Sequence, residues 1–80
     1  MRYHHFIIED EEIVKYKGQI GGVPSGFIAY PSTLSGENIY YKIVDDKITE
    51  AIGEAMHEEA ARRRVGDFLS AFLADPPGGW

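Results

Sequence analysis

The spacing of the apolar residues changes once along this chain, near Asp45. Before that residue, apolar side chains come in short runs with a period of about two, which is typical of β-strands. After it they recur at intervals of three and four, as in an amphipathic helix. The residues with this helical spacing are Ile48, Ala51, Ile52, Ala55 and Met56. The change predicts an α+β fold, with a sheet in the N-terminal half and helix in the C-terminal half.

Four segments of the N-terminal half have the composition of strands. Residues 3–8 and 13–20 are rich in aromatic and branched side chains, and the acidic run between them, residues 9–12, is expected to be a hairpin loop. A short strand over residues 27–30 is ended by Pro31, and residues 39–44 give the clearest strand pattern. We therefore expect three or four strands in an antiparallel sheet.

The helical half is too long for one straight helix in so small a domain. An unbroken helix over residues 47–74 would span about 42 Å, whereas a domain of this size is about 30 Å across. The apolar face also rotates by roughly 120° between the two parts of the segment. Gly66 is the expected break, because glycine costs a helix interior up to about 1 kcal/mol. The prediction is one broken helix or two consecutive helices, near residues 47–63 and 66–74, on one side of the sheet.

A competing interpretation pairs residues 39–44 with residues 47–52 as a β-hairpin across Asp45 and Asp46. A regular strand would then place Glu50 on the same face as Ile48 and Ile52. A carboxylate among core residues is unfavourable, so the helix is the preferred prediction for this segment.

Composition favours one small cytoplasmic domain. Residues 1–75 are expected to form a single α+β domain, and residues 76–80, which contain Pro and Gly, a flexible C-terminal tail. Cysteine is absent, which suits a reducing compartment. The sequence shows neither a signal-peptide pattern nor an apolar segment near the roughly 18 residues needed to span a bilayer.

Negative charge is concentrated in the predicted helical half. The net charge is −5, and residues 45–80 carry eight acidic against four basic side chains. Four of the acids are spaced four apart, so on a helix they would form one stripe: Asp46, Glu50, Glu54 and Glu58. Like charges at this spacing cost a helix about 0.2–0.5 kcal/mol per pair. The stripe is interpreted either as a solvated outer face of the helix or as a binding surface for a basic partner, and no membrane partner is expected.

Catalytic motifs are not supported by the sequence. Ser25 lies in a segment close to G-x-S-x-G, but valine occupies the position of the first glycine. His57 and Glu58 begin the metalloprotease helix pattern, yet Ala61 stands where the second histidine belongs. The chain is therefore predicted not to be an enzyme and to use no cofactor.

Metal binding is not expected either. His4 and His5 are adjacent in a predicted strand, so their side chains should point to opposite faces and cannot chelate one ion together. The acidic run lacks the alternating acids and central glycine of a calcium loop.

The preferred function is a non-enzymatic interaction protein that occupies a basic surface of a nucleic-acid-handling protein and inhibits or modulates it. The predicted contact residues are Asp46, Glu50, Glu54 and Glu58, supported by Glu9, Asp10, Glu11 and Glu12. In its small size, acidity and lack of cysteine the chain resembles phage-encoded inhibitors of bacterial defence, such as anti-CRISPR proteins. The resemblance is one of type, implies a host-cytoplasmic location, and assigns no role to any residue.

Two alternatives remain open. The first is nucleic-acid binding, in which phosphates would contact Arg62, Arg63 and Arg64 and bases would stack on five tyrosines if these shared an exposed sheet face. Glu58 and Glu59 are, however, placed to form ion pairs with Arg62 and Arg63. The tyrosines are Tyr3, Tyr16, Tyr30, Tyr40 and Tyr41. Alternatively, the chain forms a homodimer or larger oligomer through aromatic residues, namely Phe68, Phe72 or Trp80.

Overall fold

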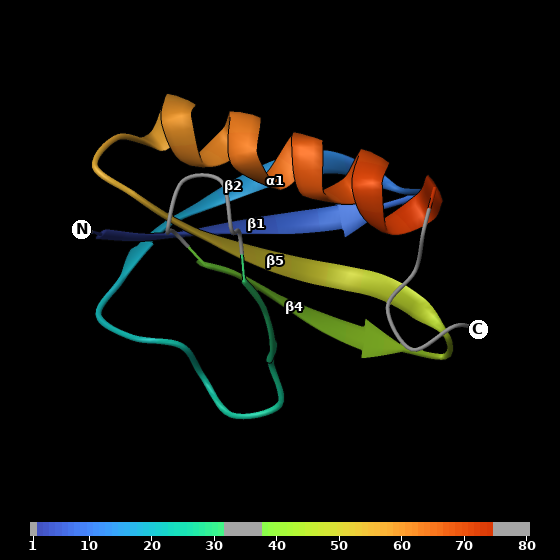
Figure 1. Cartoon of the computed structure of the whole chain (residues 1–80). Helices are drawn as coiled ribbons and strands as arrows, with labels where there is room; N and C mark the ends of the chain where they lie inside the picture. The colour runs from blue at the N-terminus through green and yellow to red at the C-terminus, as the bar shows by residue number, and fades with distance from the viewer. Residues whose placement is uncertain (1, 32–37, 75–80) are drawn as a thin grey trace.

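The computed structural model describes residues 2–31 and 38–74, in which five antiparallel strands form one sheet and one helix lies across one face of it (Figure 1). The order of the strands across the sheet is β2-β1-β5-β4-β3. The α+β class and the antiparallel sheet are thus confirmed. The elements are β1 (Arg2–Glu9), β2 (Glu12–Ile20), β3 (Ile28–Pro31), β4 (Asn38–Val44), β5 (Lys47–Ala55) and α1 (Glu58–Ala74).

The segment predicted as the first helix is the central strand of the sheet. β5 pairs with β1 on one side, from Arg2 opposite Ala55 to Ile7 opposite Glu50, and with β4 on the other. The prediction of a helix over residues 47–63 was therefore wrong, and the competing hairpin is the observed structure. Pairing on both edges satisfies the backbone of this segment and overrides its helical spacing.

A β-bulge removes the objection to this hairpin. Ile43 of β4 lies opposite Ile48, and its neighbour Lys42 lies opposite Glu50, so Thr49 is an extra residue in β5. The extra residue reverses the alternation of side chains. Ile48 therefore packs toward the core with Ile43, whereas Glu50 lies beside Lys42 on the other face.

α1 is a single helix that continues through Gly66, so the predicted break was wrong. A Cβ atom added at Gly66 would meet nothing within 4 Å, which shows that the glycine faces open space. The helix is stabilised by its packing on the sheet, and this outweighs the glycine cost of about 1 kcal/mol. Its buried residues recur every three or four positions: Ala61, Val65, Phe68, Leu69 and Phe72.

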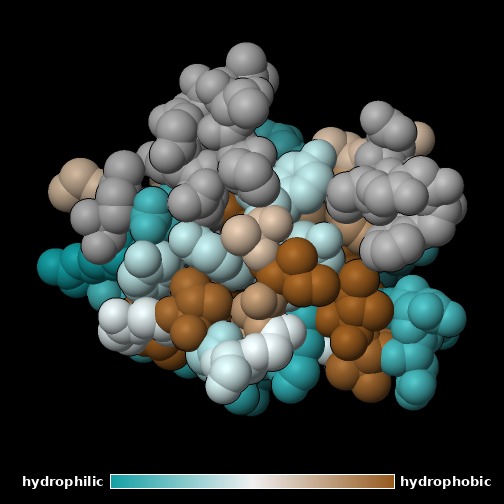
Figure 2. Space-filling model, turned by 60° about the horizontal axis from the view of Figure 1, so that its bottom comes forward, coloured by the Kyte–Doolittle hydropathy of each residue, from teal (hydrophilic) through white to brown (hydrophobic). Residues whose placement is uncertain are grey.

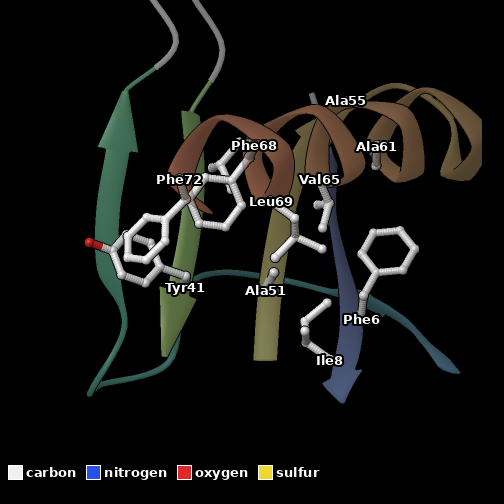
Figure 3. Close-up of a cluster of buried hydrophobic side chains, with 11 residues drawn as sticks. Phe6, Ile8, Tyr41, Ala51, Ala55, Ala61, Val65, Phe68, Leu69 and Phe72 are labelled. Atoms are coloured by element: carbon white, nitrogen blue, oxygen red, sulfur yellow. The ribbon is translucent and has the colours of Figure 1, made fainter. Parts of the chain in front are cut away.

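The core lies between α1 and the sheet (Figure 3). β1 contributes Phe6 and Ile8, and the Tyr41 ring of β4 has its centroid 5.3 Å from those of Phe68 and Phe72. Phe68 and Phe72 are thus mostly buried within the chain, at 3% and 8% exposure, which leaves little of either ring for a second copy. Trp80 and the rest of the predicted tail lie outside the described residues.

α1 approaches β5 most closely above Gly53. A Cβ atom added to this glycine would lie 3.1 Å from the carbonyl oxygen of Ala61 and 3.2 Å from a methyl carbon of Val65. Two small residues, Gly53 and Ala61, therefore set the distance between the helix and the sheet. In the described part of the chain, no helix is long and apolar enough to cross a membrane.

Candidate functional site

The four acids predicted to form one helical stripe lie in three different elements. Asp46 is in the turn between β4 and β5, Glu50 and Glu54 belong to β5, and Glu58 begins α1. The prediction of a shared helix face was wrong because residues 47–55 are extended. Three of the four carboxylates also have partners within the chain.

Glu50 lies with His5 and Lys42 on the face of the sheet away from α1. Figure 2 turns this face of the molecule toward the viewer. Oε1 of Glu50 lies 2.7 Å from Nε2 of His5, and its Oε2 lies 3.9 Å from Nζ of Lys42. The ring of Phe27 stands edge-on to His5, with centroids 5.9 Å apart. The Glu50 side chain is 25% exposed, so much of it is covered within the chain.

Glu54 and Glu58 are also engaged. A hydrogen bond from the Tyr3 hydroxyl to Glu54, and the charge of that carboxylate, raise the pKa of Tyr3. Glu58 forms an ion pair with Arg62 four residues later, at 3.0 Å. Glu58 is thus paired with a cation within the chain, whereas Glu54 keeps its charge beside a neutral hydroxyl.

In the described part of the chain, two hairpin turns of the sheet consist of two acids each, all at positive φ. Asp10 and Glu11 connect β1 to β2 with φ of 52° and 67°, and Asp45 and Asp46 connect β4 to β5 with φ of 52° and 65°. Two-residue hairpins with both central residues in this region favour Asn or Asp at the first position and Gly at the second. Asp10 and Asp45 fit the first position, whereas Glu11 and Asp46 stand where glycine is preferred, and Glu fits this conformation least well.

Both turns lie at one end of the sheet. β1 and β5 are antiparallel neighbours, so the last residue of β1 lies near the first residue of β5, and the C-terminus of α1 reaches the same end (Figure 1). Glu9 also faces Glu12 directly across β1 and β2. The last turn of α1 has no basic residue, so the negative end of the helix dipole is uncompensated there by its own side chains. We call this group the acidic end: Glu9, Asp10, Glu11, Glu12, Asp45 and Asp46.

An open groove of about 1130 Å³ lies at the acidic end, between the C-terminal part of α1 and the sheet. Ile28 of β3 and Leu73 of α1 line it and are left 49% and 46% exposed. We call it the turn-end groove. Its other apolar lining residues are Ile8, Ile43, Ile48, Leu69 and Phe72, and its acidic ones are Glu9, Asp10, Glu11 and Asp46. Lys47 and Thr49 complete the lining.

The arginine cluster does not form a free basic patch. Arg62 pairs with Glu58, and its guanidinium carbon lies 5.3 Å from the centre of the Phe6 ring. Arg63 pairs with Glu59 at 3.9 Å, and Arg64 donates to the carbonyl oxygen of Ala60 at 3.5 Å. The ion pairs anticipated from the sequence are therefore present.

The tyrosines do not share one exposed face of the sheet. The rings of Tyr41 and Tyr30 pack against Phe68 beneath α1. The rings of Tyr3 and Tyr40 pack edge to face on the opposite side of the sheet, with their centroids 6.1 Å apart. The aromatic platform that nucleic-acid binding would need is therefore not formed by these five residues.

The adjacent histidines face opposite sides of the sheet, as the strand pattern predicts. His4 is buried beneath α1, with Nδ1 2.9 Å from the Tyr16 hydroxyl and Nε2 without a hydrogen-bond partner. His5 binds Glu50 on the other face. Among the residues that the structure describes, no group of three or more His, Asp or Glu is placed to hold a metal ion.

The chain matches no protein-family model, no curated protein and no solved structure. The candidate site therefore depends on geometry alone. Sequence reasoning included the acidic run and Asp46 but missed the groove, because its walls come from β1, β3, β4, β5 and α1. The sequence signal for the second turn was the Asp45-Asp46 pair between two apolar runs.

Proposed function

We propose that this protein is a non-enzymatic interaction module that binds a basic surface of a partner protein through its acidic end. The observation that carries the proposal is the meeting of two acidic hairpin turns beside an apolar groove. Charge attracts a basic partner and speeds association, while apolar contact supplies affinity. This places the contact at the turns rather than on the stripe predicted from the sequence.

Part of the turn composition costs stability, because Glu11 and Asp46 stand at the second turn position, where glycine is preferred. A non-glycine residue at positive φ is strained by roughly 1–2 kcal/mol, and Glu11 lacks the short side chain that helps Asp tolerate this region. The direct pairing of Glu9 with Glu12 adds repulsion. Strain of this kind is typical of functional positions, and binding a cationic partner supplies a reason for it.

The partner we favour is a protein that handles nucleic acid, because such proteins carry basic surfaces shaped for phosphate charge. Carboxylates on the two turns would occupy that surface, so that the module inhibits or modulates its partner. This is the mode of action of the phage anti-defence type that the composition suggests. Nothing in the arrangement of Arg62, Arg63 and Arg64 favours direct nucleic-acid binding over this function.

A pair of charge-matched variants tests the proposal. The turn variant carries Asp10→Asn, Glu11→Gln, Asp45→Asn and Asp46→Asn, which keeps side chains of similar shape and removes the charge. The control variant removes four charges elsewhere: Glu54→Gln, Glu58→Gln, Glu59→Gln and Asp67→Asn. Both are used with the parent chain as bait for proteins of a bacterial lysate, and the affinity of each retained partner is then measured with purified protein.

The expected result is that the turn variant loses a basic partner that the parent chain and the control variant retain. Loss of the partner from the control variant alone would move the contact to the remaining acids and contradict the proposal. Circular dichroism of each variant checks that the fold is intact.

A further inference from the structure

The turn-end groove combines an apolar interior with an acidic rim. Ile28 and Leu73 leave about half of their surface in water although they lie beside buried core residues such as Leu69 and Phe72. Exposed apolar surface bordered by charge is typical of a docking site, since covering it removes apolar area from water. The rim consists of Glu9, Asp10, Glu11 and Asp46.

From this combination we infer that the groove receives an amphipathic, basic α-helix of the partner protein. The inference rests on the proposed function and specifies the partner's binding segment. Apolar side chains on one face of that helix enter the groove beside Ile28 and Leu73. Lysine or arginine side chains on its flanks reach the carboxylates of the two turns. The mode is that of a helix bound in a groove, with anchors three, four and seven positions apart.

The walls of the groove favour a helix over an extended segment. The backbones of β1 and β5 are already paired within the sheet, and β3 offers four residues, the last of them Pro31. An extended partner would leave many of its backbone groups unpaired over apolar side chains, whereas a helix satisfies its own. The volume of about 1130 Å³ also exceeds the usual 300–1,000 Å³ of a small-molecule pocket.

The charge of the rim selects among possible occupants. A second copy of this chain carries a net charge of −5, so charge opposes its approach to Glu9, Asp10, Glu11 and Asp46. Nucleic acid and anionic membranes would be repelled in the same way. A cationic segment gains from the same field, and the negative end of the α1 dipole adds to that gain.

Three labelled synthetic peptides of about 14 residues, long enough to form helix on binding, test the inference by fluorescence anisotropy with the full chain. The first consists of Leu and Lys, with the leucines at i, i+3, i+4 and i+7 so that they share one helix face. The second replaces its leucines with alanine and keeps the charge, and the third replaces its lysines with glutamine. We expect the first to bind at least about tenfold more tightly than either of the others.

Two double variants locate the binding. Ile28→Ser with Leu73→Ser removes apolar surface from the groove at exposed positions, so the fold should survive. Val14→Ser with Met56→Ser removes equally exposed apolar side chains outside the groove. The first double variant should bind the leucine–lysine peptide at least about tenfold more weakly, and the second should bind it like the parent chain.

Different outcomes overturn different claims. Equal binding of the leucine–lysine and alanine–lysine peptides, unaffected by Ile28→Ser with Leu73→Ser, would refute the groove inference and leave the basic-surface function standing. Failure of both basic peptides, together with retention of the partner by the turn variant, would refute the function itself. If the peptide binds only to a chain shortened to Ala74, the groove belongs to this chain's own C-terminal end. If the solution mass doubles with concentration, and Ile28→Ser with Leu73→Ser prevents this, the groove belongs to a second copy. Either result would refute the inference.

Discussion

Gly53 lies so close beneath Ala61 that a Cβ atom added to it would be 3.1 Å from the Ala61 carbonyl oxygen. The contact joins the central strand to the first turns of α1. It fixes how deeply the helix sits on the sheet, and therefore where Leu69, Phe72 and Leu73 stand at the turn-end groove.

Gly53→Ala should destabilise the protein, because its methyl group would lie 3.1 Å from the Ala61 carbonyl oxygen and α1 would have to shift by a few tenths of an ångström. Overpacking of this kind costs about 1–3 kcal/mol. Gly66→Ala is the matched control: its added methyl group meets nothing within 4 Å, and it should stabilise the helix by up to about 1 kcal/mol. Urea unfolding measures both, and equal effects of the two changes would contradict the close contact.

Glu11→Gly should stabilise the protein while weakening partner binding. Glycine adopts a φ near 67° without steric cost, so we expect a gain of about 0.5–1 kcal/mol in the free energy of unfolding. Gly18→Ala provides the reverse control, because Gly18 has φ of 100° with nothing within 4 Å of an added Cβ, and only backbone strain is introduced. A loss of stability in the Glu11→Gly chain would show that the turn is not strained.

Glu50→Gln should destabilise the folded state by about 1 kcal/mol, after allowance for partial exposure, since it removes a carboxylate that binds His5 and Lys42. Glu59→Gln removes the same charge from a side chain that is 83% exposed and paired with Arg63 at 3.9 Å, so its effect should be close to zero. Chemical denaturation at low salt compares the two. Indistinguishable curves would place Glu50 among the solvated surface charges.

Alkaline pH should destabilise the protein through Tyr41. Burial, and secondarily the neighbouring Tyr30, raise the pKa of Tyr41 above its ordinary value of 10.0, so the folded state binds the phenolic proton more tightly than the unfolded chain. The resulting stability is fully present below about pH 10 and is lost as the pH rises through the folded pKa. Tyr41→Phe should therefore lose less stability than the parent chain as the pH rises above the ordinary tyrosine pKa of 10.0, in unfolding experiments at each pH. Parallel losses in the two chains would assign the effect to other groups, such as Tyr16.

Much of the N-terminal half followed from sequence because its strands are rich in aromatic and branched residues, as residues 39–44 are. The central strand did not, because Ala51 and Ala55 are good helix formers and fall at helical spacing. They are small for a different reason, which is that α1 packs directly onto them and Gly53. Thr49 concealed the strand further, since its bulge disguises the alternation of Ile48 and Glu50.

The candidate site was predictable only where its residues are local. The acidic run and the Asp45-Asp46 pair are visible in the sequence, and their proximity follows once β1 and β5 are neighbours. The apolar part of the groove is assembled from five elements, and no periodicity within one segment indicates it.

The pairing of β1 with β5 has a consequence for the order in which the chain folds. The hairpins β1–β2 and β4–β5 involve residues close in sequence, whereas the central pair joins residues as far apart as Arg2 and Ala55. Closing so long a loop is the slow step expected of the folding reaction. Because that step brings two negatively charged turns together, dissolved salt should accelerate refolding by screening their repulsion.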